Sequence, residues 1–78
     1  MICRKKDFDE AYLAECVWMI SENAYPHGSP WTKMQFLADI QQPHSDYLLL
    51  AEDNQICGFI GYSKVIDEVE ITNIAVAV

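Results

Sequence analysis

Apolar residues recur at steps of three and four in the first part of the chain and in continuous runs in the second part. The helical spacing follows Asp7, which can cap a helix with Glu10 in capping-box position, and it continues to about Ala24. A second capping signal at Thr32 precedes a shorter apolar pattern that stops before Pro43. The pattern therefore predicts two amphipathic helices.

The remaining apolar runs have the length and composition of β-strands. They are bounded by short polar segments rich in Asp, Asn and Glu, as turns usually are. The predicted strands are Met1–Lys5, Tyr47–Glu52, Ile56–Ser63 and Val69–Val78, with turns at residues 53–55 and 67–68. The last three strands follow one another closely, which predicts an antiparallel meander.

Length and charge narrow the class of protein. Seventy-eight residues form at most one small domain, although a hydrophobic fraction of 51% indicates that the chain folds. Twelve acidic and five basic residues give a net charge of −7. This charge repels phosphate backbones and favours a cationic or amine-bearing partner, although solubility alone also explains it. We therefore expect no nucleic-acid binding.

The cysteines and the lengths of the apolar runs indicate a cytoplasmic protein. Cys3, Cys16 and Cys57 are odd in number and lack C-x-x-C spacing, which predicts inert thiols in or near the core of a reduced protein. His27 and His44 are too far apart for a local metal pair, so we expect no metal site. The apolar runs are much shorter than a membrane span, so we expect no membrane partner.

Two segments are candidates for ligand contact. The loop between the predicted helices holds Tyr25, His27 and Trp31, whose side chains combine an apolar body with a polar tip. The last strand changes from a polar first half, which includes Glu70, to the five apolar residues Ile74–Val78. A strand that is apolar on both faces is buried on both sides in most folds.

Six segments of the chain, taken in order, resemble one known family. They are Met1–Lys5, Ser29–Phe36 with its Pro-Trp-Thr-x-x-x-Phe pattern, Ala51–Asp53, Gly58–Tyr62, Val65–Glu68 and Asn73–Val76. The family is the GNAT N-acetyltransferases, and the resemblance is nearest to the Rim-type ribosomal-protein alanine N-acetyltransferases. It implies an α/β fold in which residues 1–78 form the N-terminal half of a GNAT domain: one strand, two helices and a three-stranded antiparallel meander.

The resemblance also implies acetyl-CoA as the cofactor. In that family the fourth strand carries a bulge and separates from the next strand, so that its backbone pairs with the pantetheine arm instead. Carried over to this chain, the backbone of Ile74, Ala75 and Val76 would hold the acetyl-pantetheine end, and an amide there would polarise the thioester carbonyl. The alternative is that these residues only form a core strand.

By the same resemblance, the acceptor would be a protein N-terminal amine, such as that of a ribosomal protein. Tyr25, His27 and Trp31 would line the acceptor groove, with Trp31 as a hydrophobic plug beside the second helix as the alternative. Glu70 stands where some GNAT enzymes place a general base, which needs only modest strength because an α-amine titrates near pH ~8. The alternative for Glu70 is a solvated carboxylate on the face of the strand.

The family continues after the fourth strand into a Gly-rich loop that binds the pyrophosphate of CoA, and no such loop occurs within these 78 residues. We therefore expect an N-terminal fragment of the acetyltransferase that binds acetyl-CoA weakly or not at all and is inactive alone. One alternative is a catalytically inactive module that forms a homodimer through its exposed strand Ile71–Val78. Another is a small acidic interaction domain without acetyltransferase ancestry.

Overall fold

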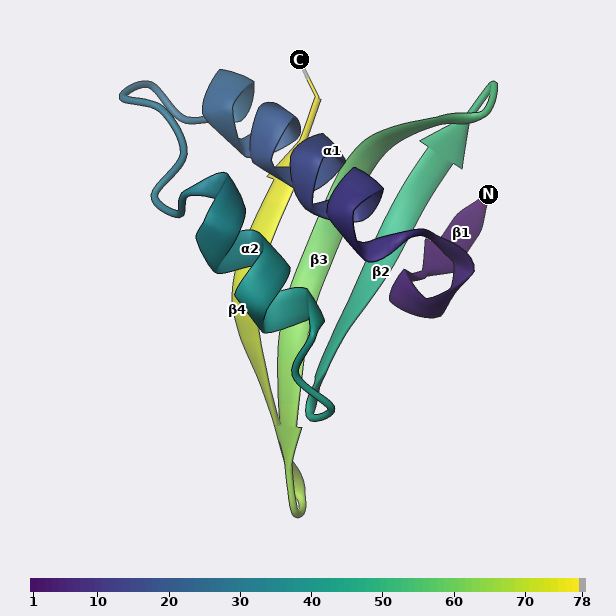
Figure 1. Cartoon of the computed structure of the whole chain (residues 1–78), viewed down its shortest axis with the longest axis vertical. Coiled ribbons are helices and arrows are strands. Elements are labelled where there is room, and N and C mark those ends of the chain that lie inside the picture. The colour runs from purple at the N-terminus through teal and green to yellow at the C-terminus, as the bar shows by residue number, and fades with distance from the viewer. Residues whose placement is uncertain (78) are drawn as a thin grey trace.

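The computed structural model describes residues 1–77, so Val78, the end of the predicted last strand, lies outside the described residues. Four strands form one antiparallel sheet in the order β1-β2-β3-β4. The strands are β1 (Ile2–Arg4), β2 (Ser45–Glu52), β3 (Gln55–Val65) and β4 (Glu68–Val76). The helices α1 (Glu10–Ala24) and α2 (Lys33–Ile40) cover one face of this sheet (Figure 1). The predicted α/β class and the predicted order of elements are confirmed.

Helix α1 begins two residues later than the sequence pattern predicts. Its cap is Asp9, whose carboxylate accepts the backbone N–H of Tyr12 at 3.1 Å. The predicted cap, Asp7, is wrong, because Asp7 ends a short 3₁₀ turn and its carboxylate accepts the N–H of Arg4 at 2.9 Å. Asp7 therefore fixes the exit from β1, and Asp9 starts the helix.

Helix α2 follows its prediction closely. The Thr32 hydroxyl accepts the N–H of Gln35 at 3.1 Å, and the Gln35 side chain accepts the N–H of Thr32 at 2.8 Å. This reciprocal capping box satisfies two amides that the first turn of a helix leaves free. The helix ends at Ile40, before Pro43 as predicted.

The first turn of the meander is one residue shorter than predicted, and the second lies one residue earlier than predicted. Asp53 and Asn54 both have positive φ, 51° and 66°, which is the pattern of the type I′ hairpin turn. At the next turn Ile66 has a φ of 54°, in the region that suits glycine and strains a β-branched residue. Both turns contain two residues, because Gln55 and Glu68 already pair within the sheet.

The core lies between the two helices and the sheet. The residues buried there are Leu13, Ala14, Val17, Ile20, Phe36, Ile40, Tyr47, Leu49, Phe59 and Ala75. The ring of Phe36 packs edge-on against Phe59, with 5.8 Å between ring centroids. The ring of Tyr47 crosses Gly61 so closely that a Cβ on this glycine would lie 3.0 Å from it. Gly61 therefore allows the close approach that a glycine inside a strand suggests.

Candidate functional site: the free edge of β4

Strand β4 contains one more residue than the segment of β3 that it pairs with. Asn73 and Ile71 pair with consecutive residues of β3, so Thr72 has no partner of its own and forms a β-bulge. Successive side chains of a strand point to opposite faces, and the extra residue shifts this alternation by one. Asn73 is consequently buried on the helix side of the sheet, whereas Ile74 points to the open face.

Beyond the bulge, alternate peptide groups of β4 face away from β3. The N–H of Ala77 donates to the carbonyl of Cys57 on β3 at 2.7 Å. Because backbone groups alternate along an antiparallel strand, Ala75 also faces β3, while Ile74 and Val76 face outward. Strand β4 is the last strand of the described sheet, so these outward groups form a free edge. Of the three residues predicted to hold the cofactor, Ile74 and Val76 therefore have outward-facing backbone groups, whereas the backbone groups of Ala75 face β3.

A residue from the predicted acceptor loop reaches this edge. The hydroxyl of Tyr25 donates to the carbonyl oxygen of Ile74 at 3.1 Å, although 49 positions separate the two residues. Tyr25 directly follows Ala24, the last residue of α1, so the helix carries its ring to the edge. The structure thus brings together one predicted acceptor residue and one predicted cofactor residue.

The loop after Tyr25 is held against α1 by polar contacts. The Glu22 carboxylate accepts the N–H of Ser29 at 3.1 Å, and the hydroxyls of Ser29 and Ser21 lie 2.9 Å apart. Gly28 has a φ of +86°, and a Cβ there would lie 2.3 Å from the Glu22 carboxylate. These contacts fix the loop at the position where its first residue meets β4.

The other predicted site residues are Trp31, His27 and Glu70. Trp31 is partly buried, with its ring centroid 5.2 Å from that of Phe36, as the alternative of a hydrophobic plug requires. His27 is exposed on the loop. Glu70 is also exposed, and it precedes Ile74 by four positions of β4, or roughly 13 Å of extended strand.

The structure also places Asn73, which the sequence pattern did not single out, directly after the bulge of β4. Its side chain is only 6% exposed, and its Nδ2 has no hydrogen-bond partner among residues 1–77. An unpaired buried amide typically costs about 1–3 kcal/mol. The signal in the sequence is the polar pair Thr72-Asn73 inside an apolar strand, and this pair marks the bulge.

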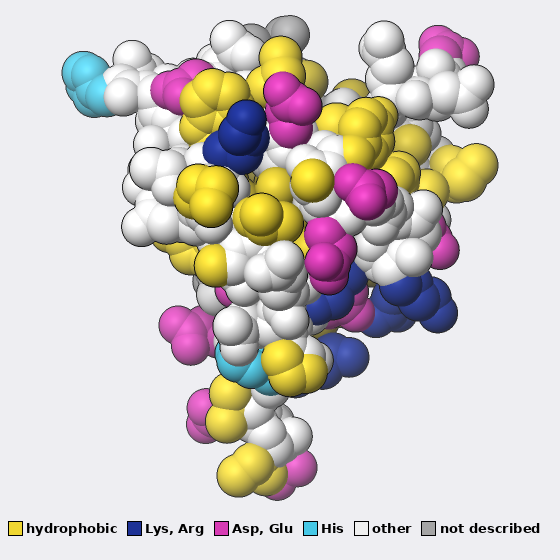
Figure 2. All heavy atoms as spheres, viewed as in Figure 1, with side chains coloured by type: hydrophobic (Ala, Val, Ile, Leu, Met, Phe, Trp, Pro, Cys, Tyr) yellow, Lys and Arg dark blue, Asp and Glu magenta, His cyan; other side chains and the backbone are white. Residues whose placement is uncertain are grey.

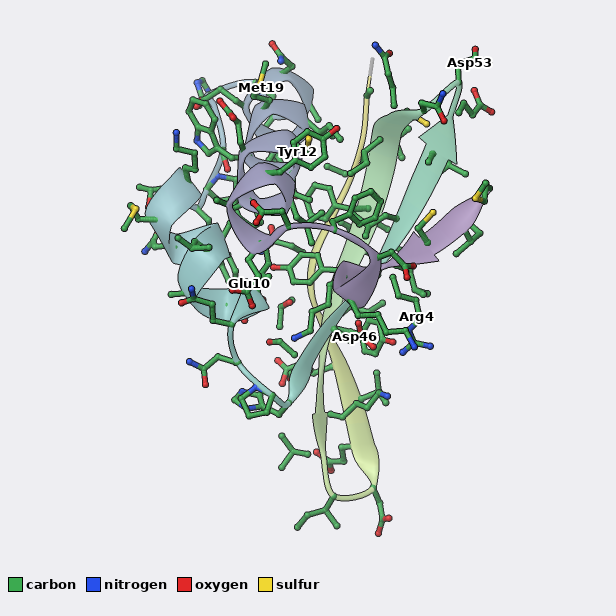
Figure 3. The ribbon with its side chains drawn as sticks, turned by 45° about the vertical axis from the view of Figure 1, so that its right-hand side comes forward. Arg4, Glu10, Tyr12, Met19, Asp46 and Asp53 are labelled. Atoms are coloured by element: carbon green, nitrogen blue, oxygen red, sulfur yellow. The ribbon has the colours of Figure 1, made fainter. Side chains whose placement is uncertain are left out.

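A second polar group lies at the far end of the open face. Arg4 and Asp46 come from adjacent strands and point toward one another (Figure 3), where they form an ion pair. The hydroxyl of Tyr62 donates to the same carboxylate at 3.3 Å. Burial by itself would raise the pKa of Asp46, but the hydrogen bond and charge of Arg4 outweigh it and hold this pKa below its usual range.

The structure gives three further findings on the predicted chemistry. The three cysteines are unpaired and partly buried. Within residues 1–77, no three His, Cys, Asp or Glu side chains lie close enough together to hold a metal ion. No helix in this part of the chain is long and apolar enough to cross a membrane.

A strand, two helices on one face and a meander ending in a bulged edge strand together make the N-terminal half of a GNAT fold. The chain is 34% identical over 74 residues to a protein of Bacillus subtilis (strain 168) named as a putative ribosomal protein bS18-alanine N-acetyltransferase. The crystal structure of the ribosomal-protein-S18-alanine N-acetyltransferase from Escherichia coli matches 97% of the chain with a TM-score of 0.76 and 22% identity. No family model matches the sequence.

These comparisons confirm the predicted resemblance and the predicted fold. The structural match, at 22% identity, supports the fold alone. The chain spans 44% of the length of the Bacillus subtilis protein and 46% of the Escherichia coli chain. The match therefore concerns less than half of the length of each of these proteins.

Proposed function

We propose that this chain forms the acetyl-donor half of an N-acetyltransferase that uses acetyl-CoA and acts on a protein N-terminal amine. The observation that carries the proposal is the free edge of β4 beyond the bulge, where the peptide groups of Ile74 and Val76 face outward. A pantetheine arm contains amide groups of its own, so it can pair with such an edge as another strand would.

The chemistry required of this edge is orientation and polarisation. Acetyl-CoA would supply an acetyl group activated as a thioester. An outward N–H of Ile74 or Val76 is the kind of fixed donor that stabilises the oxyanion formed when an amine attacks such a carbonyl. The Tyr25 hydroxyl lies against Ile74 at its carbonyl, which leaves the outward N–H of Val76 as the less crowded donor and the better candidate.

The acceptor side of the proposed site begins at Tyr25. Its hydroxyl lies at the β4 edge, and the loop that continues to His27 and Trp31 is fixed by Glu22. A chain with a net charge of −7 attracts a basic peptide. The names of both relatives suggest ribosomal proteins as the class of acceptor. Glu70 remains a candidate base only if a chain of several water molecules bridges the roughly 13 Å to the edge.

Proline substitution tests the edge without disturbing the sheet. Val76→Pro removes an outward N–H, and Val69→Pro is the matched control. The N–H of Lys64 donates to the carbonyl of His44, the residue before β2, so the backbone groups of Lys64 face β2 and not β4. Val69, which pairs with Lys64, therefore also faces outward. Both valines are well exposed, at 60% and 66%. The two substitutions therefore differ mainly in their distance from the proposed site.

The assay joins residues 1–77 to the C-terminal part of the Bacillus subtilis relative and measures acetyl transfer to an Ala-initiated basic peptide. We expect Val76→Pro to reduce kcat/KM at least ten-fold, since removing one oxyanion donor commonly costs ~10²-fold or more. Val69→Pro should stay within about two-fold of the parent chimaera. Equal activities of the two variants would contradict the proposed role of the edge.

A second candidate function is self-association through the same edge. The open face next to it carries exposed apolar side chains, with Ile74 at 51% and Val76 at 60% exposure, and a free strand edge recruits another strand. Light scattering of the 78-residue chain tests this, with Val76→Pro expected to shift a dimer toward monomer. If both functions use one edge, acetyl-CoA should also shift the dimer toward monomer.

A further inference from the structure

The cationic residues of this acidic chain gather at one hollow. Four of its five Lys and Arg residues line a cavity of about 430 Å³ between β1, the start of β2 and the end of β3. The ionisable residues of this cavity are Arg4, Lys5, Lys6, His44, Asp46 and Lys64. Figure 2 shows most of the visible Lys and Arg side chains grouped at one side, with one further basic side chain apart from them.

Two of these cations already have partners within the fold. Arg4 pairs with Asp46, which neutralises the carboxylate in the cavity. The Nζ of Lys5 donates to the carbonyls of Ile40 and Gln42, both at 2.9 Å, where α2 ends. These contacts join the walls of the cavity to one another. The net charge of the side chains that line the cavity stays positive.

The other two cations have no ion pair or hydrogen bond to a described side chain. The Nζ of Lys64 lies 5.7 Å from the ring centroid of Tyr62, a cation–π contact that leaves the ammonium protons free for a ligand. Lys6 makes no ion pair within residues 1–77. A cavity wall with two uncompensated ammonium groups matches a ligand with two negative charges.

We propose that this cavity binds a phosphate group. A phosphate monoester carries ~1.5 to 2 negative charges at neutral pH and offers several strong acceptor oxygens to lysine and to the free N–H groups of Arg4. The cavity of about 430 Å³ has the size of an ordinary small-molecule site, so it leaves room for the organic part of an ester. The acidic remainder of the surface opposes a long polyanion, so a small phosphate ester is the expected source.

Lys33 provides a matched control for Lys64. Its Nζ lies 6.0 Å from the ring centroid of Trp18, so it also makes a cation–π contact, but it is not part of the cavity. Lys64→Gln and Lys33→Gln therefore remove the same charge and a similar contact. Only the first should affect phosphate binding.

The experiment is a titration of the ¹⁵N-labelled 78-residue chain with pyrophosphate at low ionic strength, followed by NMR. We expect saturable shifts at residues 4–6, 44–46 and 64, with Lys6→Gln and Lys64→Gln each weakening binding about five-fold, the effect of ~1 kcal/mol. Lys33→Gln should change the affinity less than two-fold, and the dispersion of the spectra reports that each variant is folded.

A parallel titration with a short single-stranded oligonucleotide distinguishes the source of the phosphate. Affinity no higher than that of pyrophosphate assigns the site to a small ester, and much tighter, steeply salt-dependent binding assigns it to a nucleic-acid strand. The absence of saturable shifts up to about 10 mM pyrophosphate, where even weak sites fill, would overturn the proposal. Equal weakening by Lys33→Gln would also overturn it.

Discussion

Replacing Asn73 by leucine tests whether the bulge of β4 retains an unpaired amide at the expense of stability. The side chain is 6% exposed, and its Nδ2 lacks a partner among the described residues. Leucine has a similar size, removes a penalty of about 1–3 kcal/mol and buries apolar atoms instead.

We therefore expect Asn73→Leu to raise the unfolding free energy by about 1–2 kcal/mol, allowing for imperfect packing. In a domain of this size each kcal/mol raises the Tm by roughly 4–8 °C. Urea unfolding followed by circular dichroism measures the change, at one protein concentration because self-association would shift the curve. Asn23→Leu is the control, since Asn23 is exposed and its Nδ2 donates to the carbonyl of Met19 at 2.9 Å.

A loss of stability in Asn73→Leu larger than about 1 kcal/mol would refute the reasoning, because it would mean that the amide has a partner in solution. The chimaera adds a functional comparison. If Asn73 supports the proposed site, the leucine variant will be more stable and less active. Greater stability with unchanged acetyl transfer would separate Asn73 from that site.

Three further predictions concern single residues. Ile66→Gly should raise the unfolding free energy by about 1 kcal/mol by removing the strain of a positive φ, and unchanged urea curves would contradict this. The folded-state pKa of Asp46 lies below its unfolded value, so its stabilising effect is present above about pH 4 and is lost as the pH falls through the folded pKa. Asp46→Asn should therefore flatten the acid limb of a stability–pH curve. Glu70→Gln should lower kcat/KM of the chimaera less than ten-fold, whereas a 100-fold loss would identify Glu70 as the base.

The helices and strands follow from periodicity because each pattern is local. The position of the α1 cap cannot be predicted from such a local pattern. Asp7 and Asp9 are both good caps, and Asp7 has the better spacing to Glu10. The pairing of β1 with β2 decides between them, because it places Asp7 where its carboxylate accepts the N–H of Arg4. This pairing joins residues more than 40 positions apart, which local patterns do not reveal.

The contact between Tyr25 and Ile74 and the ion pair between Arg4 and Asp46 are non-local in the same way. The residue types alone make Tyr25 a reasonable ligand-contact candidate, but they do not indicate that it reaches the edge of β4. Nothing in the spacing of Arg4 and Asp46 predicts that they meet. The sequence therefore supplies candidates, and the register of the strands determines which of them come together.

The bulge at Thr72 shows why the register decides the proposed function. Glu68 faces β3 because it closes the two-residue turn, so in an unbulged strand every even-numbered position of β4 would face β3 too. The peptide groups of Ile74 and Val76 would then be engaged with β3, and their side chains would point into the core. The extra residue reverses both orientations: it turns these peptide groups outward and places Ala75 in the core. A single unpaired residue thus creates the free edge on which the proposed acetyl-donor site depends.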